Sequence, residues 1–529
     1  MIKVLISDDL SEQGVEVFRK TSGIEVDVKV GLKPDELKTI IKNYHGLVVR
    51  SATKVTKEII EAAEQLRVVG RAGSGTDNID KEAATKKGIV VMNTPGGNTV
   101  TTAEHALAML MALVRNIPQA TASMKAGKWE KKKFMGSEIY NKTLGIIGMG
   151  KIGSVVADRA RGLKMNVIVY DPFVTPAFAE RLGVELVSLD ELLRRADFIT
   201  IHTPKNKETE NLINKEAFQK MKPGVRIINC ARGGIVNEAD LYDAIKSGKV
   251  AGAALDVFTQ EPPPPDHPLL QLDQVICTPH LGASTEEAQV NVAVDIAKQM
   301  VDFLLHGTIN NAVNVPSISG ELLANLSPFL TLAEAMGSFQ SQIISGTIVE
   351  VNIEYSGNLI AYDLKPVTIY LLKGLLKKFD EDVNFVNALN IAQERGIKVV
   401  DAKSTEATDF TDLITLKTKT TAGTNLLAGT VFGKHDPWIV RIDDFRIEAA
   451  LESNMLLFQA QDKPGVIGNI GSTLAKNNIN ISRMQFGRKE KEGKALVILG
   501  VDSPYSEELF QSLSKLPNII SVKKIHLEI

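Results

Sequence analysis

A glycine-rich turn between an apolar run and a helical pattern restricts the fold of this chain more than any other feature. The turn follows the strand-like run Leu144 to Ile147 and consists of Gly148-Met149-Gly150-Lys151-Ile152-Gly153. In a G-x-G-x-x-G turn the first glycine permits the bend, the second lets backbone approach a pyrophosphate, and the third packs helix on strand. The helix start also offers free N–H groups to phosphate. Glycines also form ordinary turns, but this position predicts a dinucleotide site of the Rossmann type.

An acidic residue at the end of the next predicted strand indicates which dinucleotide is bound. That strand spans Asn166 to Tyr170, and Asp171 follows it, 18 residues after Gly153. An acid near this spacing hydrogen-bonds the ribose 2′-hydroxyl and disfavours a 2′-phosphate. No arginine follows Asp171 immediately. The sequence therefore predicts NAD rather than NADP as the cofactor.

Short β-branched runs alternate with amphipathic stretches in two regions of the chain. The first region covers residues 1–97, with runs such as Lys3 to Ile6 and Leu47 to Val49, and the second covers residues 143–279. This alternation is typical of a doubly wound parallel sheet. We therefore predict an α/β fold with two tandem Rossmann-like domains.

Two long helical patterns flank the second region, at Thr99 to Asn116 and Ser284 to Leu305. The later one opens with Ser, Thr and Glu, which suits a capping box. If it packs back on the first region, the second domain is inserted in the first, and the cleft between them is the usual place for a ligand. The earlier helix is more apolar than a solvent-facing connector requires, so a dimer or tetramer is expected.

Length and composition limit the class of protein. A chain of 529 residues is longer than one hydrophobic core usually organises. Hydrophobic content of 44%, charged content of 23% and 40 glycines suit an α/β protein better than a fibrous, disordered or membrane protein. The formal net charge of -2 gives no general attraction for nucleic acid or acidic membranes. The apolar stretch Ala106 to Val114 is shorter than the ~20 residues that span a bilayer.

The amino terminus and the cysteines bear on location. The opening MIKVLISDDL is strand-like and lacks the pattern of a secretion signal. Cys230 and Cys277 lie far apart and form no metal-binding or redox spacing. We therefore expect a cytoplasmic protein with no structural disulfide and no metal site.

Three residues near the ends of late predicted strands suit hydride chemistry. Moving a hydride between a hydroxy acid and a nicotinamide needs a cation for the carboxylate, an acid–base for the hydroxyl and a group that orients the acid–base. Arg232 can bind a carboxylate through both arms of its guanidinium. His280 can exchange a proton as the acid–base, and Glu261 can orient its imidazole. Spacing alone leaves this triad open, and most other histidines are expected to be bystanders, among them His105, His202 and His267.

Taken together, these motifs resemble the D-2-hydroxyacid dehydrogenase family. The resemblance rests on the glycine turn with Asp171, the NCARGG segment around Arg232, the pair Glu261-Pro262 and the PHLGAST segment around His280. It implies that His280 is the acid–base, Glu261 its partner, and Arg232 the anchor for the substrate carboxylate on the nicotinamide side. It also implies that further cofactor contacts come from Lys151, Ile152, Thr203, Cys230, Ala231, Asp256, Gly282 and Ala283.

Two loops of the first region resemble the substrate loops of family members that act on a phosphorylated acid. One spans Val49 to Val55 and the other Gly70 to Gly75; their candidate substrate contacts are Arg50, Ser51, Ser74 and Gly75. The resemblance implies oxidation of 3-phospho-D-glycerate to 3-phosphohydroxypyruvate by NAD, the first step of L-serine biosynthesis. Arg50 is then expected near the phosphate.

The pattern of residues along the chain changes after a linker-like run at residues 314–320. Residues 321–450 resemble the α+β intervening domain of the long-form members of the family. Residues 454–529 show a β-α-β-β-α-β pattern and resemble an ACT domain, a module that pairs edge to edge and binds amino acids at the interface. Asp462 and Asn480 match effector-binding positions. Ala460 stands where some serine-inhibited relatives carry a larger polar side chain, which leaves inhibition by L-serine open.

Four domains are therefore predicted. Residues 1–98 and 283–315 form a substrate-binding lid, 99–282 the NAD-binding domain, 316–452 the intervening domain and 453–529 the ACT domain. Two alternative functions share the nicotinamide motifs. The first is a glyoxylate or hydroxypyruvate reductase, but that activity would not explain the carboxy-terminal module. The second is an NADH-sensing scaffold that resembles corepressors of the same fold, but this sequence shows no disordered interaction tail.

Overall fold

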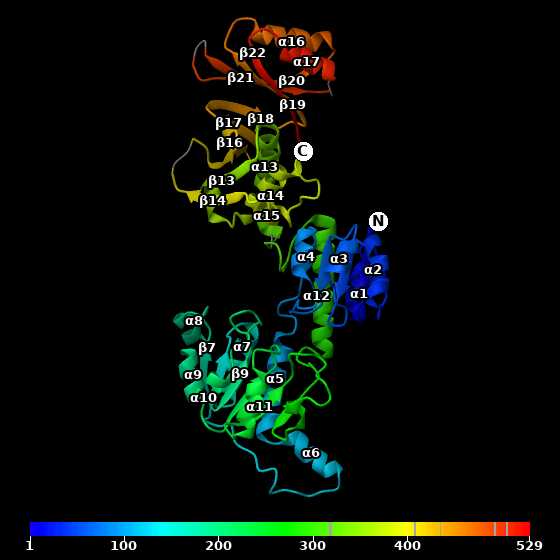
Figure 1. Cartoon of the computed structure of the whole chain (residues 1–529), viewed down its shortest axis with the longest axis vertical. Helices are drawn as coiled ribbons and strands as arrows, with labels where there is room; N and C mark the ends of the chain where they lie inside the picture. The colour runs from blue at the N-terminus through cyan, green and yellow to red at the C-terminus, as the bar shows by residue number, and fades with distance from the viewer. Residues whose placement is uncertain (317–319, 407–408, 434, 491–492, 504–505, 529) are drawn as a thin grey trace.

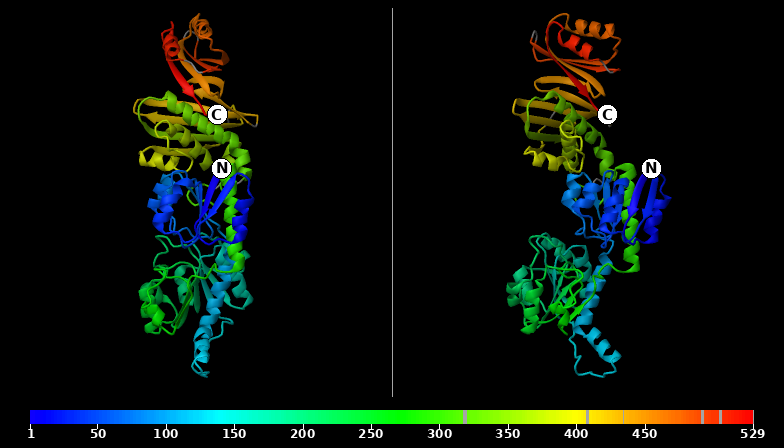
Figure 2. Two further views of the ribbon diagram at one scale, coloured as in Figure 1. Left: turned by 90° about the vertical axis from the view of Figure 1, so that its right-hand side faces the viewer. Right: turned by 45° about the vertical axis from the view of Figure 1, so that its right-hand side comes forward.

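The computed structural model describes residues 1–316, 320–406, 409–433, 435–490, 493–503 and 506–528. Within them the chain forms four β-sheets, of five, seven, six and four strands. The sheets stack along an elongated molecule, with the seven-stranded sheet at one end and the carboxy-terminal sheet at the other (Figures 1 and 2). Part of the predicted linker, residues 317–319, lies outside the described residues.

The first sheet, with the helices around it, is called the first lobe here. Its strands pair in parallel in the order β2-β1-β3-β4-β5. They are β1 (Ile2–Ile6), β2 (Ile24–Val28), β3 (Gly46–Val49), β4 (Val68–Arg71) and β5 (Val90–Met92). The intervening helices are α1 (Glu12–Lys20), α2 (Pro34–Ile40), the 3-10 turn η1 (Ile41–Asn43), α3 (Lys57–Ala62) and α4 (Lys81–Lys86). Apolar side chains cover both faces of this sheet, so its strands are buried.

The seven-stranded sheet and its helices form the second lobe. The strand order is β12-β11-β10-β9-β6-β7-β8, all parallel. The strands are β6 (Thr143–Ile147), β7 (Asn166–Tyr170), β8 (Glu185–Leu186), β9 (Phe198–Ile201), β10 (Val225–Asn229), β11 (Val250–Leu255) and β12 (Val275–Cys277). The helices are α7 (Lys151–Gly162), α8 (Pro176–Arg181), α9 (Leu189–Arg195), α10 (Lys215–Lys220), α11 (Glu238–Lys246) and the 3-10 turn η2 (Pro268–Gln271). The order reverses between β6 and β9, where Rossmann folds bind ligands.

Two long helices connect the lobes, α5 (Thr99–Val114) and α12 (Glu286–His306). Helix α5 packs on α7 of the second lobe, whereas α12 packs on α1 of the first. A Cβ on Gly14 would lie 2.7 Å from the Cβ of Ala293, so glycine permits this close approach. Where the connections cross, the Thr101 and Thr285 hydroxyl oxygens lie 3.3 Å apart. The second lobe is therefore an insertion in the first, and the predicted fold class is confirmed.

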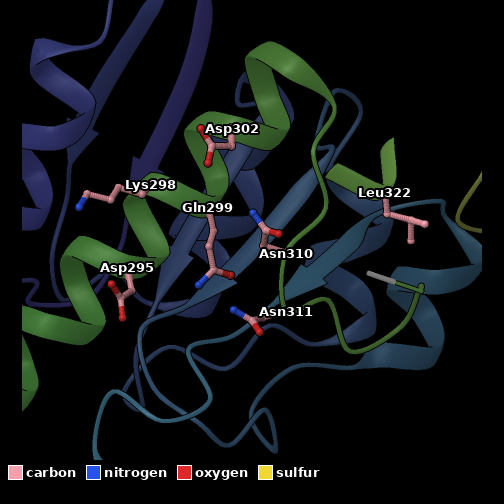
Figure 3. A pocket seen from close by; sticks show the side chains of 7 residues that line it. All are labelled: Asp295, Lys298, Gln299, Asp302, Asn310, Asn311 and Leu322. Carbon is pink, nitrogen blue, oxygen red and sulfur yellow. The ribbon is translucent and has the colours of Figure 1, made fainter. Parts of the chain in front are cut away.

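A polar pocket of about 560 Å³ marks the place where α12 returns to the first sheet (Figure 3). Gln299 points from α12 toward Asn310 and Asn311, while Asp295 and Lys298 are exposed on the helix. With its amide nitrogen turned toward them, Gln299 donates to the carbonyl oxygens of Asn93 and Asn310, at 3.2 and 2.9 Å. These contacts attach the end of α12 to the edge of the first sheet.

The third sheet has the order β14-β13-β15-β16-β17-β18. Its strands are β13 (Ile348–Gly357), β14 (Lys398–Ser404), β15 (Asp412–Thr420), β16 (Gly423–Phe432), β17 (Asp436–Ile442) and β18 (Phe445–Ala450). The helical segments are α13 (Gly320–Ile343), α14 (Lys365–Lys377), α15 (Ala388–Glu394) and the 3-10 turn η3 (Asn358–Ala361). Helices α13 and α14 cross closely, and Gly337 permits this crossing because a Cβ there would lie 2.1 Å from the Leu371 carbonyl oxygen.

The fourth sheet is antiparallel, in the order β20-β21-β19-β22. Its elements are β19 (Asn454–Gln461), α16 (Val466–Lys476), β20 (Ile481–Arg488), β21 (Lys494–Val501), α17 (Glu507–Ser514) and β22 (Ile519–His526). This is the predicted β-α-β-β-α-β order. Across the described part of the chain, no helix combines the length and apolar character that a membrane span needs.

Candidate active site

A pocket of about 740 Å³ between the two lobes contains most of the predicted site residues. From the first lobe its lining includes Arg50, Ser51, Ser74 and Gly75. From the second lobe it includes Ile152, Thr203, Cys230, Ala231, Arg232, Glu261, His280, Gly282 and Ala283. The carboxyl ends of parallel strands share one edge of a sheet, which is why segments distant in sequence meet here.

His280 and Glu261 form a hydrogen-bonded pair in this pocket. Imidazole Nδ1 lies 2.7 Å from Glu261 Oε2, and Glu261 Oε1 accepts from the backbone N–H of Phe258 at 3.1 Å. Burial raises the pKa of Glu261, but the hydrogen bonds from His280 and Phe258 outweigh burial and hold that pKa below its usual range. An ionised carboxylate accepts the Nδ1 proton, which leaves Nε2 to exchange a proton with a substrate.

Arg232 reaches across the pocket from the end of β10. Its Nε donates to Asp77 Oδ2 of the first lobe at 3.1 Å, and its Nη1 donates to the Ala231 carbonyl oxygen at 2.7 Å. A Cβ on Gly75 would lie 2.0 Å from Arg232 Nη2, so only glycine leaves room for the guanidinium. Burial raises the pKa of Asp77, but the charge and hydrogen bond of Arg232 and the charge of Lys81 together hold that pKa below its usual range. This ion pair therefore orients Arg232 between the lobes.

Sequence reasoning missed two further cations that line the pocket, Arg71 and Lys81. Arg71 ends β4, and its Nε is shielded from solvent and has no hydrogen-bond partner among the described residues. Burial and the charge of Arg232 lower the pKa of Arg71 to about 10, so it stays protonated at neutral pH. With Arg50, which donates to the Asp9 carbonyl oxygen at 3.0 Å, these cations suit a substrate with two anionic groups. The position of Arg71 within the predicted substrate loop, Gly70 to Gly75, could have identified it from the sequence.

The glycine turn has the geometry that a bound dinucleotide needs. Gly148 has a φ of 95°, and a Cβ on Gly153 would lie 2.1 Å from the Gly148 carbonyl oxygen. Gly150 caps α7, and a Cβ there would meet no atom within 4 Å, so phosphate has an open approach to the helix start. Lys151 Nζ donates to the Pro95 carbonyl oxygen at 2.9 Å. These residues fit NAD, although Gly148, Gly150, Lys151 and Gly153 do not line the pocket itself.

The two predicted acids of the cofactor site lie at strand ends. Asp171 follows β7 and accepts from the backbone N–H groups of Met149 and Phe173, at 2.7 and 2.8 Å. It therefore lies beside the glycine turn, where a ribose would be bound. Asp256 follows β11 and is buried behind the pocket, where it accepts hydrogen bonds from the loop that carries His280.

The two predicted effector residues do not lie together in one chain. Asp462 follows β19 at one end of the fourth sheet, and its backbone N–H donates to the Gly493 carbonyl oxygen. The Asp462 carboxylate lies 3.4 Å from Arg488 Nη1. Asn480 precedes β20 at the opposite end and donates to Asp502 Oδ2 at 2.6 Å. A site that uses both residues therefore needs two copies of this domain.

Family models match three parts of the chain. They are the D-isomer specific 2-hydroxyacid dehydrogenase NAD binding domain at residues 107–282, the D-3-phosphoglycerate dehydrogenase intervening domain at 325–443 and the ACT domain at 454–518. A solved NAD-dependent formate dehydrogenase from Staphylococcus aureus, in complex with NAD, matches 60% of this chain and all of its own with a TM-score of 0.54 and 29% identity. The dehydrogenase fold is thus shared with solved structures.

Relatives match over the whole length. D-3-phosphoglycerate dehydrogenase of Archaeoglobus fulgidus is 46% identical over 99% of this chain and 100% of its own. The enzyme of the same name from Bacillus subtilis is 43% identical over the full length of both. Together with the paired His280 and Glu261 and the three matched domains, this identity shows that the chain belongs to the D-3-phosphoglycerate dehydrogenases, NAD-dependent enzymes of the D-2-hydroxyacid dehydrogenase family.

Proposed function

We propose that this protein oxidises 3-phospho-D-glycerate to 3-phosphohydroxypyruvate with NAD, the first step of L-serine biosynthesis. The observation that carries the proposal is one pocket that contains the His280–Glu261 pair and the cations Arg232, Arg50 and Arg71. The pair suits the C2 hydroxyl, and the separated cations suit a substrate with a carboxylate at one end and a phosphate at the other. The full-length similarity to D-3-phosphoglycerate dehydrogenases supports the same substrate.

Each side chain has a distinct role in the proposed reaction. Bound NAD supplies the acceptor for the hydride that leaves C2. Arg232 binds the substrate carboxylate through its guanidinium, and Arg50 with Arg71 binds the phosphate. His280 Nε2 takes the proton of the C2 hydroxyl, and Glu261 stabilises the imidazolium that forms. In the reverse direction the same imidazolium returns the proton to the keto oxygen.

A substrate panel tests the function. Initial rates with NAD and 3-phospho-D-glycerate are compared with rates for unphosphorylated D-glycerate, and in reverse with glyoxylate and hydroxypyruvate. We expect the highest kcat/KM with the phosphorylated acid. Preference for unphosphorylated acids would instead support a glyoxylate or hydroxypyruvate reductase, and tight NADH binding without turnover would support a sensing scaffold.

Replacing Glu261 by Gln is expected to change the acidic limb of the pH dependence of kcat/KM. The neutral amide replaces the carboxylate that accepts from His280 Nδ1 and stabilises the imidazolium formed during the reaction. The matched control is Glu238→Gln, because Glu238 pairs with His267 at 3.1 Å outside the pocket. A Glu261→Gln profile that superimposes on the wild type would contradict the assigned pairing.

We also propose that the protein is a homo-oligomer, a dimer or a tetramer, in the cytoplasm. An arm projects from the second lobe after α5 and includes α6 (Ile117–Lys125), which has no buried residue (Figure 1). Trp129 and Met135 on this arm are 80% and 81% exposed, and such apolar exposure is typical of a contact between copies. The two free cysteines, Cys230 and Cys277, suit a reducing compartment.

The double substitution Trp129→Glu with Met135→Glu is expected to reduce the mass of the assembly, because two charges would be buried at the contact. Sedimentation velocity measures the change. Phe173→Glu is the control, since Phe173 is 88% exposed on the second lobe but outside the arm. Unchanged sedimentation of the double variant would show that the arm does not form the contact.

An amino-acid effector, L-serine, completes the proposal. Strand β20 is an edge strand and exposes Met484 and Phe486, at 45% and 42%. Antiparallel pairing of two β20 strands would bring Asp462 of one copy near Asn480 of the other. Ala460 is fully buried in the core of this domain and contributes nothing to that edge. Initial rates with and without L-serine test the effector.

A further inference from the structure

The loop that carries His280 folds around a single buried residue, Asp256. Its backbone oxygen accepts from the His280 N–H at 2.9 Å. Its carboxylate accepts from the N–H groups of Leu281 and Gly282, at 2.7 and 2.8 Å, and from the Thr278 hydroxyl at 2.6 Å. His280 itself has a φ of 55°, a left-handed conformation that costs energy for a residue with a side chain. Asp256 therefore maintains a strained loop.

The carboxylate of Asp256 forms an ion pair with His105 of α5. Imidazole Nε2 lies 3.2 Å from both Asp256 Oδ1 and the Thr278 hydroxyl oxygen. The side chain of Asp256 has no exposed surface, and that of His105 is 18% exposed. A buried carboxylate is costly unless hydrogen bonds or an opposite charge compensate it. Burial raises the pKa of Asp256, but the hydrogen bonds from His105, Thr278 and the Leu281 N–H, together with the charge of His105, hold that pKa below its usual range.

The same residues do not have the character of a metal site. Ligand atoms of His105, Cys230 and Asp256 lie within 4.8 Å of one another. However, the backbone and Thr278 already donate to both oxygens of the carboxylate. Burial and the charge of Asp256 raise the pKa of the Cys230 thiol, so it stays protonated and binds metal poorly. The geometry instead indicates a hydrogen-bonded support for the loop.

We infer that His105 is a positioning residue for the dehydrogenase reaction: through Asp256 and Thr278 it keeps residues 278–282 in the form that directs His280 into the pocket. The inference rests on the proposed function. Helix α5 holds the loop at further points, because Thr102 donates to the Gly282 carbonyl oxygen at 2.8 Å and the Thr278 hydroxyl lies 3.9 Å from Met109 Sδ. Within the described parts of the chain, loss of the His105 imidazole leaves a buried carboxylate whose remaining donors all belong to the loop it supports.

The test compares His105→Phe, which preserves a ring, with His105→Gln, whose amide can donate in place of Nε2. We expect His105→Phe to lower kcat about 10- to 100-fold, because a small misplacement of an acid–base is enough for such a loss. KM for 3-phospho-D-glycerate should change little, and His105→Gln should recover most of the rate. Glu104→Gln on the same helix is the control, since Glu104 pairs with Arg159 on the surface.

A second measurement separates this inference from the proposed function. The His280 ring resonance in a histidine-labelled NMR spectrum should shift in His105→Phe and in Thr278→Val, and stay in place in Glu104→Gln. This readout needs no turnover, so it remains informative if 3-phospho-D-glycerate proves not to be the substrate. Wild-type kcat together with an unmoved His280 resonance in His105→Phe would overturn the inference, as would a loss confined to KM. If His105→Phe does not fold, Thr278→Val decides by the same two criteria.

Discussion

Replacing His280 by alanine is expected to lower kcat for 3-phospho-D-glycerate about 10²- to 10⁴-fold, the range that a positioned acid–base contributes. Among the pocket-lining residues the other imidazole is that of His202, and burial lowers its pKa to about 4, so it cannot replace His280. Steady-state kinetics measures the loss, and fluorescence titration with NADH shows whether the cofactor still binds.

The control for this substitution is His306→Ala, which changes an exposed imidazole at the end of α12. It should leave kcat unchanged. Circular dichroism and thermal melting establish that the His280→Ala variant is folded. A folded variant with turnover close to the wild type would remove His280 from the mechanism.

Replacing Arg232 by alanine is expected to lower kcat/KM for 3-phospho-D-glycerate by about two to three orders of magnitude. The guanidinium is the proposed partner of the substrate carboxylate, and removing one partner of a charge pair that is buried when the substrate binds costs about 2–5 kcal/mol. Asp77, whose side chain is 69% exposed, would also lose its ion pair. Arg232→Lys should recover little of the loss, because an ammonium lacks the planar fork that binds a carboxylate through two parallel hydrogen bonds.

Steady-state kinetics over a range of substrate concentrations tests this second prediction. The matched control is Arg226→Lys, since Arg226 lies on the same strand β10 but faces Ser137 at 3.3 Å, away from the pocket. Full activity of Arg232→Lys would mean that charge alone suffices. Full activity of Arg232→Ala would exclude Arg232 from substrate binding.

Much of the fold could be predicted because its signals are local. The turn from Gly148 to Gly153 has a fixed relation to the strand before it and the helix after it, and the structure shows β6 and α7 at those places. The alternation of β-branched and amphipathic stretches is also a local pattern, and it correctly predicted the two parallel sheets. The strand ends then predict which side chains share an edge, and Arg232 and His280 do line one pocket.

Other features depend on contacts that no local pattern reveals. Helical periodicity places His105 on a face of α5, but its partner Asp256 lies 151 positions later, where β11 ends. Asp77 pairs with Arg232 across the two lobes, so neither segment alone indicates the bond. Asp462 and Asn480 match one motif in sequence, yet the strand order places them at opposite ends of a sheet.

The insertion of the second lobe has a mechanical consequence. The chain passes between the lobes twice, and the two passages touch at Thr101 and Thr285. Two neighbouring tethers define an axis, so the lobes can swing about that line without stretching either passage. Such a hinge rotation would increase the distance between Arg50 on one lobe and Arg232 on the other. The pocket would open to admit a substrate, while the core of each lobe would stay unchanged.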